Sequence, residues 1–246
     1  EQAISKTKQY ESYHPNDTAF KTLGRIYSVV GNYKEALLAY NKAENFAKQN
    51  DTFYLNRSSV HYNLNDFENS VHDLDKCLNI NPKYGLAIYR KANLLGDELS
   101  EKAYYNLIDS AISNDITVSN AIKVKVEYDL DRNAFSKALA LNKKAFAAGM
   151  DSSMYYYNKA LLHYEKDQNS QAYNALEQSI ASDSQNYEAY YFLTEIYAED
   201  EKFKKAIANA EYLLKILPET INKAGVYVTL AFCYSEIGND TAACKN

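Results

Sequence analysis

The sequence contains little glycine, proline or cysteine, and it contains no tryptophan. Its 246 residues include 7 Gly, 3 Pro and 3 Cys. So few turn-forming residues disfavour an all-β fold, which needs many tight turns. Three cysteines without a CxxC pair do not make a disulfide framework. Both shortages point away from small cystine-rich and all-β domains.

Long apolar runs and a surplus of positive charge are also absent. The run 226–232 is among the longest, and it falls far short of the roughly 18–20 residues that span a bilayer. The 27 basic and 32 acidic side chains leave a net charge of −5, whereas proteins that follow a phosphate backbone need a surplus of Lys and Arg. We therefore expect no transmembrane segment in this chain and no nucleic-acid partner.

Small residues recur along the chain at a nearly constant interval. The successive intervals are 33, 34, 33, 35, 34, 34 and 37 residues in the series Ala3, Ala36, Ser70, Ala103, Ala138, Ala172, Ala206 and Ala243. A small residue at a fixed place in each period lets two helix backbones approach closely. Apolar residues such as Phe20, Leu23 and Tyr27 are three and four apart, as on one helix face. Segments typical of turns, such as 30–32 and 64–66, lie between the two predicted helices of a period. The predicted unit is therefore helix–turn–helix.

The residues of these units match a family pattern. The segment from Asn32 to Leu37, preceded by Gly24, Tyr27 and Gly31, resembles the tetratricopeptide repeat, as does the unit that starts at residue 51. The resemblance covers essentially the whole chain and implies an all-α fold, a right-handed α-solenoid of helix–turn–helix repeats. The predicted single domain, 1–246, comprises a partial repeat at 1–16, repeats at 17–50, 51–84, 85–117, 118–152, 153–186 and 187–220, and a partial repeat at 224–246.

Some features depart from a regular, capped array. Repeat 85–117 lacks the usual loop glycine and is one residue short, and Asn142 stands where a large apolar residue is expected. We expect these departures to affect register and curvature rather than the fold. Terminal repeats need a polar cap or a partner, and neither end has a capping pattern. We therefore expect the native polypeptide to continue past Asn246.

The sequence carries no recognisable catalytic signature. It lacks GxSxG, HExxH, Walker and GxGxxG motifs, and none of its four histidines has a second histidine at the i+4 spacing of a helical zinc site. His61 and His163 occupy a repeat position held elsewhere by tyrosine, which favours packing over metal binding. Cys77 is in a small-residue position, while Cys233 and Cys244 are expected to be free thiols. We predict no enzyme activity, no cofactor and no metal site.

The resemblance also implies where a partner binds, because the first helix of each repeat in this family lines a concave groove. The predicted partner-binding residues are Lys21, Arg25, Asn56, Tyr62, Tyr89, Arg90, Tyr157, Asn158, Tyr164, Tyr191 and Glu195. The N-terminal members are basic or carry amides, which suits an acidic or carboxylate-ended peptide. The C-terminal members are aromatic and acidic, and tyrosine is a rigid, amphipathic anchor.

We therefore predict a non-catalytic scaffold or adaptor that binds a protein or peptide within a larger assembly. The chain composition would fit a bacterial cell-envelope protein. Two alternatives remain open. One is the regulatory or sensing arm of a longer signalling protein. The other is a receptor for chaperone tails, because Lys21, Asn56 and Arg90 match positions of the carboxylate clamp, although Arg25 and Leu86 do not.

Overall fold

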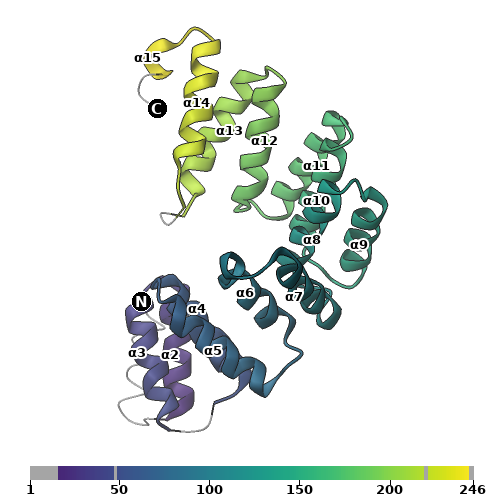
Figure 1. Cartoon of the computed structure of the whole chain (residues 1–246). Coiled ribbons are helices and arrows are strands. Elements are labelled where there is room, and N and C mark those ends of the chain that lie inside the picture. Colours follow the sequence, from purple (N-terminus) through teal and green to yellow (C-terminus); the bar gives the residue numbers. More distant parts are fainter. Residues whose placement is uncertain (1–15, 47–48, 219–220, 244–246) are drawn as a thin grey trace. The chain divides into compact units, whose positions relative to one another are not determined.

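The computed structural model describes residues 16–46, 49–218 and 221–243. Within these ranges the regular elements are α-helices and one short 3₁₀ helix, with no strand, and successive helices fold back on one another (Figure 1). The predicted all-α solenoid of helix–turn–helix units is thereby confirmed. The predicted partial repeat at 1–16 lies, but for its last residue, outside the described residues.

The chain divides into two compact units, Glu1–Ala121 and Ile122–Asn246. The first unit contains the helix pairs α2 (Asp17–Val29) and α3 (Tyr33–Glu44), α4 (Asp51–Asn63) and α5 (Phe67–Ile80), and α6 (Gly85–Leu94) and α7 (Glu101–Asn114). Each pair falls within one predicted repeat. The first and second repeats therefore place their helices where the periodicity predicts them.

The second unit continues the same order of elements. Its helices are α8 (Ser119–Asp131), which begins just before the unit boundary, α9 (Phe135–Ala147), α10 (Ser152–Tyr164), α11 (Asn169–Ser182), α12 (Tyr187–Glu199), α13 (Phe203–Ile216), α14 (Ala224–Glu236) and α15 (Asp240–Ala243). These bounds agree with the predicted repeats to within a residue. One continuous solenoid over the whole chain stays a prediction.

Two asparagines cap helices of the first unit. The Oδ1 atom of Asn16 accepts a hydrogen bond from the backbone N–H of Ala19 at 2.9 Å, and Oδ1 of Asn50 accepts one from Phe53 at 2.9 Å. Both asparagines satisfy a donor that the first helical turn leaves without an intrahelical partner. The sequence Asn-Asp-Thr occurs at 16–18 and again at 50–52, and it begins α2 and α4.

A left-handed residue closes the turn between the two helices of most repeats. It is one of Gly31, Asn65, Asn133, Asp167 and Glu201, with φ values of 76°, 58°, 56°, 55° and 56°. The third repeat differs, since the 3₁₀ helix Gly96–Glu98 leads into Leu99 with φ of −94°. In this repeat α6 has only 10 residues, and the turn 95–100 is longer than the turns 30–32 and 64–66.

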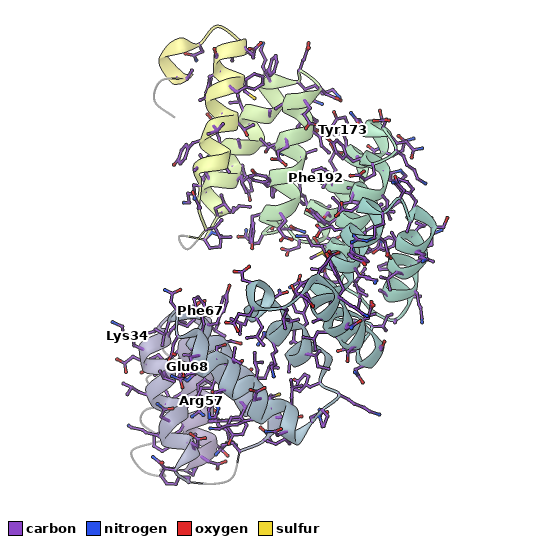
Figure 2. All side chains as sticks on the ribbon, viewed as in Figure 1. Lys34, Arg57, Phe67, Glu68, Tyr173 and Phe192 are labelled. Carbon is purple, nitrogen blue, oxygen red and sulfur yellow. The ribbon has the colours of Figure 1, made fainter. Side chains whose placement is uncertain are left out.

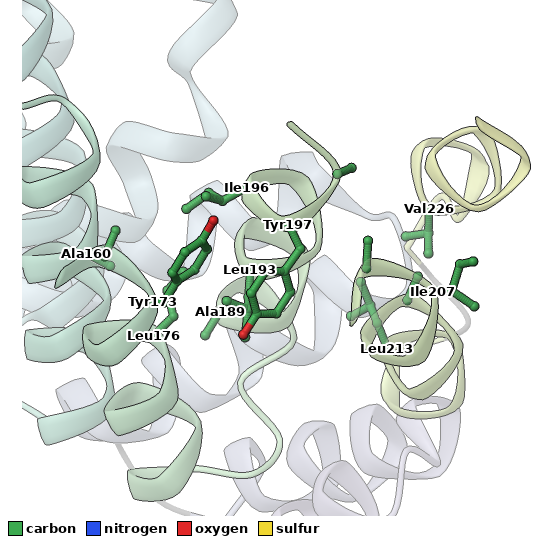
Figure 3. Close-up of a cluster of buried hydrophobic side chains, with 14 of the residues drawn as sticks. Ala160, Tyr173, Leu176, Ala189, Leu193, Ile196, Tyr197, Ile207, Leu213 and Val226 are labelled. Carbon is green, nitrogen blue, oxygen red and sulfur yellow. The ribbon is translucent and has the colours of Figure 1, made fainter. Parts of the chain in front are cut away.

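The small-residue positions mark close helix contacts. A Cβ atom on Gly24 would lie 2.8 Å from ring atoms of Tyr40, so α2 and α3 could not approach as closely with a larger residue. Ala172 and Ala206 are fully buried. Figure 3 shows the core of the second unit, where the ring of Tyr173 stacks on that of Tyr197 with centroids 4.9 Å apart.

An ion-pair cluster joins three helices of the first unit. The guanidinium of Arg57 on α4 donates to both carboxylate oxygens of Asp73 on α5, at 2.7 and 2.9 Å. It also donates to Glu44 on α3 at 2.6 Å, and Figure 2 labels this arginine. Arg57 and Asp73 are almost entirely buried. Arg57 and Asp73 belong to the second repeat and Glu44 to the first, so the ion pair between Arg57 and Glu44 links the two repeats.

Candidate partner-binding surface

The predicted partner-binding residues lie on the first helices of their repeats. Lys21 and Arg25 are on α2, Asn56 and Tyr62 on α4, and Tyr89 and Arg90 on α6. The rest are on α10 and α12. We call these first-helix positions the groove surface, and each unit is considered separately below.

A cavity of about 370 Å³ opens between α4 and α6 in the first unit. Tyr62, Tyr89 and Arg90 line it, together with Ser59 and Asn93. Tyr62 is 55% exposed, although its ring also contacts the ring of Phe67. The cavity thus combines hydroxyl, amide, aromatic and cationic groups.

Arg90 is the charged side chain of this cavity. Its Nη1 atom donates to Oγ of Ser59 at 2.5 Å and to the carbonyl oxygen of Leu55 at 3.3 Å. Burial lowers the pKa of Arg90, but an arginine remains protonated at neutral pH. No carboxylate among the described residues pairs with it. The geometry therefore leaves a partly desolvated cation able to receive an anionic group.

The remaining predicted residues of the first unit do not line this cavity. The Nζ atom of Lys21 forms an ion pair with Asp17 at 2.7 Å, one helical turn away. Arg25 is exposed and Asn56 is half-buried. The structure thus brings together Tyr62, Tyr89 and Arg90, but not the full set of clamp-like residues.

Aromatic rings and carboxylates make up the groove surface of the second unit. The ring of Tyr157 on α10 is 8% exposed and lies 6.0 Å from that of Phe192 on α12, which Figure 2 labels. Nζ of Lys123 lies 5.0 Å from the Tyr157 ring and forms an ion pair with Glu188 at 2.7 Å. Burial raises the pKa of Tyr157, and Glu188 adds to that increase. Tyr157 is therefore a buried residue.

Tyr164 and Tyr191 are more accessible. The hydroxyl of Tyr164 donates to Glu199 at 2.7 Å, and this bond, with burial, raises the pKa of Tyr164 to about 12. Tyr191 is 37% exposed, and its hydroxyl crosses to α14, where a Cβ atom on Gly225 would lie 2.8 Å from it. Burial raises the pKa of Glu195, which is half-buried beside Tyr191.

Asn158 requires a correction, because it was expected to face the groove. Its side chain is fully buried, and Nδ2 donates to Oδ1 of Asn142 at 3.1 Å. The side chain therefore holds α9 and α10 together and does not present a contact surface. Tyr157, the groove position before it, also differs from the prediction, because it is buried in the core of the second unit and packs against Phe192.

Two exposed apolar residues of α14 were missed. Val228 and Phe232 occupy the same places in their helix as Tyr191 and Glu195 do in α12. They are 69% and 50% exposed. Counting the groove positions into the predicted first helix at 224 would have identified both residues.

Three structural features bear on other classes of function. No described helix has the length and apolar character needed to cross a membrane. Among the described residues, no group of three or more His, Cys, Asp and Glu side chains is arranged to hold a metal ion. Cys77 is fully buried, and burial raises its pKa to about 11. The small-residue role predicted for Cys77 fits this burial. Cys233 is also buried with a free thiol, and Cys244 lies outside the described residues.

Comparison with known proteins gives one family match and several structural ones. Residues 52–84 match the family model of the tetratricopeptide repeat, and they nearly coincide with the second predicted repeat. A tetratricopeptide repeat protein from Parabacteroides merdae has a similar structure, with a TM-score of 0.69 and 18% identity, over 94% of this chain and 91% of that one.

Two further structures share the fold. PilW, a type IV pilus biogenesis factor, has a TM-score of 0.61 and 16% identity, over 81% of this chain and 91% of its own. The Cut9–Hcn1 assembly of APC/C has a chain with a TM-score of 0.70 and 12% identity, over 99% of this chain and 50% of that chain. The helix pairs and the shared fold lead to one conclusion: the chain has the fold of tetratricopeptide repeat proteins, and its residues 52–84 match the model of that repeat.

Proposed function

We propose that the chain is a non-catalytic scaffold that binds a segment of a partner protein along its groove surface. The observation that carries this proposal is the cavity between α4 and α6, where Arg90 has no acidic partner among the described residues and lies beside the exposed Tyr62. Tetratricopeptide repeats are protein-interaction modules, and the accessible groups of the cavity are those that bind peptides well. Arginine and tyrosine are both enriched among residues that dominate binding energy.

The cavity offers recognition chemistry rather than reaction chemistry. The described residues that line it include no His, Cys, Asp or Glu, so they supply no general base or acidic group for proton transfer. Arg90 and the asparagine amides can donate hydrogen bonds to a carboxylate or to backbone carbonyl oxygens of an extended peptide. We therefore assign binding to this site and no catalytic step.

Quantitative partner capture tests the proposal. The full chain, immobilised, is used to capture partners from its source cells, and the bound partner is compared for Tyr62→Ser and Arg90→Gln. The matched controls are Leu38→Ser and Tyr212→Ser, which change exposed residues on the second helices α3 and α13. We expect the first two variants to lose most of the bound partner and both controls to retain it. Equal capture by all four variants would remove the cavity as a binding surface.

A second candidate is a receptor for a partner's C-terminal carboxylate. The absence of a described acidic partner for Arg90 favours it, whereas Lys21 is already paired with Asp17. Titration of an acidic pentapeptide with a free C-terminus against its amidated form decides the matter. Tighter binding of the free acid, lost in Arg90→Gln, supports the carboxylate receptor. Equal affinity for the two forms rejects it.

We also propose that the scaffold works inside a larger assembly in the bacterial cell envelope. Similarity of fold to a pilus biogenesis factor motivates the compartment. The alternative is an arm of a longer signalling protein. Native electrophoresis of membrane and periplasmic fractions, followed by mass spectrometry, distinguishes the two proposals. Co-migration with several different polypeptides supports the assembly, whereas a single long polypeptide with an effector domain supports the alternative.

A further inference from the structure

The first helix of the last repeat exposes an apolar face. Val228 and Phe232 on α14 are 69% and 50% exposed, and they are four residues apart, so they lie on the same side of the helix. The ring of Phe203, at the start of α13, meets that of Phe232 edge to face with centroids 5.9 Å apart. These three side chains form a continuous apolar floor.

This floor is the base of a cavity of about 540 Å³ within the second unit. The cavity lies between the end of α12, the turn before α13, and α14. Glutamates form much of its rim: Glu195 and Glu199 from α12, Glu201 from the turn, and Glu236 from α14. We call the floor and rim together the acidic groove.

The rim carboxylates are not neutralised by the protein itself. Among the described residues, none of the four forms an ion pair with a lysine or arginine. The nearby Lys202 pairs with Asp200 instead, at 3.1 Å. Burial raises the pKa of Glu195, and the negative charge of Glu199 raises it further. Glu195 and Glu199 thus repel one another beside an apolar surface that is exposed to water.

We propose that the acidic groove binds a basic, amphipathic segment of a partner protein. Its apolar side chains would cover Val228, Phe232 and Phe203, while its lysines or arginines would reach the four glutamates. Charge complementarity selects this occupant, since a cation offsets the repulsion between neighbouring carboxylates. A second copy of this chain, with its net charge of −5, is a poorer match. The inference rests on the proposed function and names the partner chemistry for one part of the groove surface.

Fluorescence anisotropy with the full chain tests the inference. The first probe is a short labelled peptide that forms an amphipathic helix with leucine on one face and lysine on the other. The second probe is the same peptide with glutamate in place of each lysine. We expect the lysine peptide to bind about tenfold more tightly than the glutamate peptide at low salt, and this preference to shrink as salt is raised. Equal affinity for the two peptides would overturn the inference.

Two double variants connect the binding to the groove. Val228→Ser with Phe232→Ser should weaken the lysine peptide about tenfold, because the apolar floor is removed. Glu199→Gln with Glu236→Gln should weaken it several-fold and reduce the salt dependence. The matched controls, Val29→Ser with Leu38→Ser and Glu35→Gln with Glu68→Gln, change exposed residues of the first unit and should bind as the wild type does. The inference fails if controls and groove variants behave alike.

Two further measurements separate other outcomes. If sedimentation shows a wild-type dimer that Val228→Ser with Phe232→Ser dissociates, the occupant is a second copy and the inference is wrong. Partner capture by the α4–α6 cavity is measured alongside, with the Tyr62→Ser and Arg90→Gln variants described above. If Tyr62→Ser and Arg90→Gln still reduce partner capture while the lysine and glutamate peptides bind the acidic groove equally well, this inference alone is wrong. If Tyr62→Ser and Arg90→Gln capture as much partner as the wild type does, the proposed function is wrong instead.

Discussion

Asn158 and Asn142 pair with each other inside the core of the second unit. Nδ2 of Asn158 donates to Oδ1 of Asn142 at 3.1 Å, and Nδ2 of Asn142 donates to the carbonyl oxygen of Tyr155 at 3.1 Å. The two side chains are 0% and 1% exposed. The asparagine that breaks the repeat pattern on α9 is thus matched by a second asparagine on α10. Both side-chain N–H groups have an acceptor, whereas Oδ1 of Asn158 has no hydrogen-bond partner among the described residues.

This pairing predicts a non-additive response to mutation. Asn142→Leu alone leaves the Asn158 amide buried without its acceptor, which should lower the free energy of unfolding by about 1–3 kcal/mol. The double variant Asn142→Leu with Asn158→Leu should recover a substantial part of that loss, since an apolar pair needs no hydrogen bond. Urea denaturation of the wild type, both single variants and the double variant measures the coupling. Strictly additive effects would contradict the pairing.

The Arg57 cluster should behave as a buried ion pair. Arg57→Leu leaves Asp73 buried without its counter-ion, and we expect a loss of about 3–5 kcal/mol in the free energy of unfolding. Arg57→Leu with Asp73→Leu should be much closer to the wild type, because both charges are removed. Guanidinium denaturation followed by circular dichroism provides the comparison. A double variant as unstable as Arg57→Leu would show that packing, not the unpaired charge, causes the loss.

The same cluster predicts an acid-dependent loss of stability. The hydrogen bond from Arg57 lowers the pKa of Glu44, and the charges of Arg57 and Lys76 act in the same direction. A carboxylate with a lowered pKa in the folded state adds stability above its unfolded pKa of about 4.3, and this stability disappears as the pH falls through the folded pKa. Between pH 7 and pH 3, wild-type stability should therefore fall more steeply than that of Glu44→Gln. Parallel pH profiles for the two proteins would show that Glu44 does not contribute.

The turn before α13 predicts a stabilising substitution. Glu201 has a φ of 56°, a conformation that costs a residue with a side chain about 1 kcal/mol or more. Glu201→Gly should therefore raise the free energy of unfolding by about 0.5–1 kcal/mol, after allowing for the greater freedom of glycine in the unfolded chain. Leu99→Gly, in the corresponding turn of the third repeat, is the control, because Leu99 has a φ of −94°. Thermal melts should show a gain for the first variant and none for the second.

The periodicity of small and apolar residues was enough to predict that the chain folds into helix pairs. It succeeds because each repeat must bury the same face against its neighbour, as Gly24 does against Tyr40. The third turn escaped prediction, because a 3₁₀ helix replaces the left-handed residue there. Local sequence does not reveal which of these two ways of closing a turn is used.

The candidate site was only partly predictable. Counting helix positions correctly placed Tyr62 and Tyr191 on accessible surface, but it placed Asn158 there too. The reason is that Asn142, sixteen residues away, buries Asn158 by pairing with it. Arg57 was not recognised as a buried residue, since its partners Glu44 and Asp73 come from two other helices. Such pairings depend on tertiary contacts that no spacing rule describes.

Site-specific photo-crosslinking in the source cells tests the central claim most directly. Benzoylphenylalanine replaces Tyr62 or Tyr191 on first helices, and Leu38 or Phe146 on the second helices α3 and α9. All four side chains are exposed, so access to solvent does not distinguish them. The account predicts covalent adducts with a partner protein at Tyr62 and Tyr191 and none at Leu38 and Phe146. Adducts of equal yield at all four positions, or adducts confined to the second helices, would contradict it.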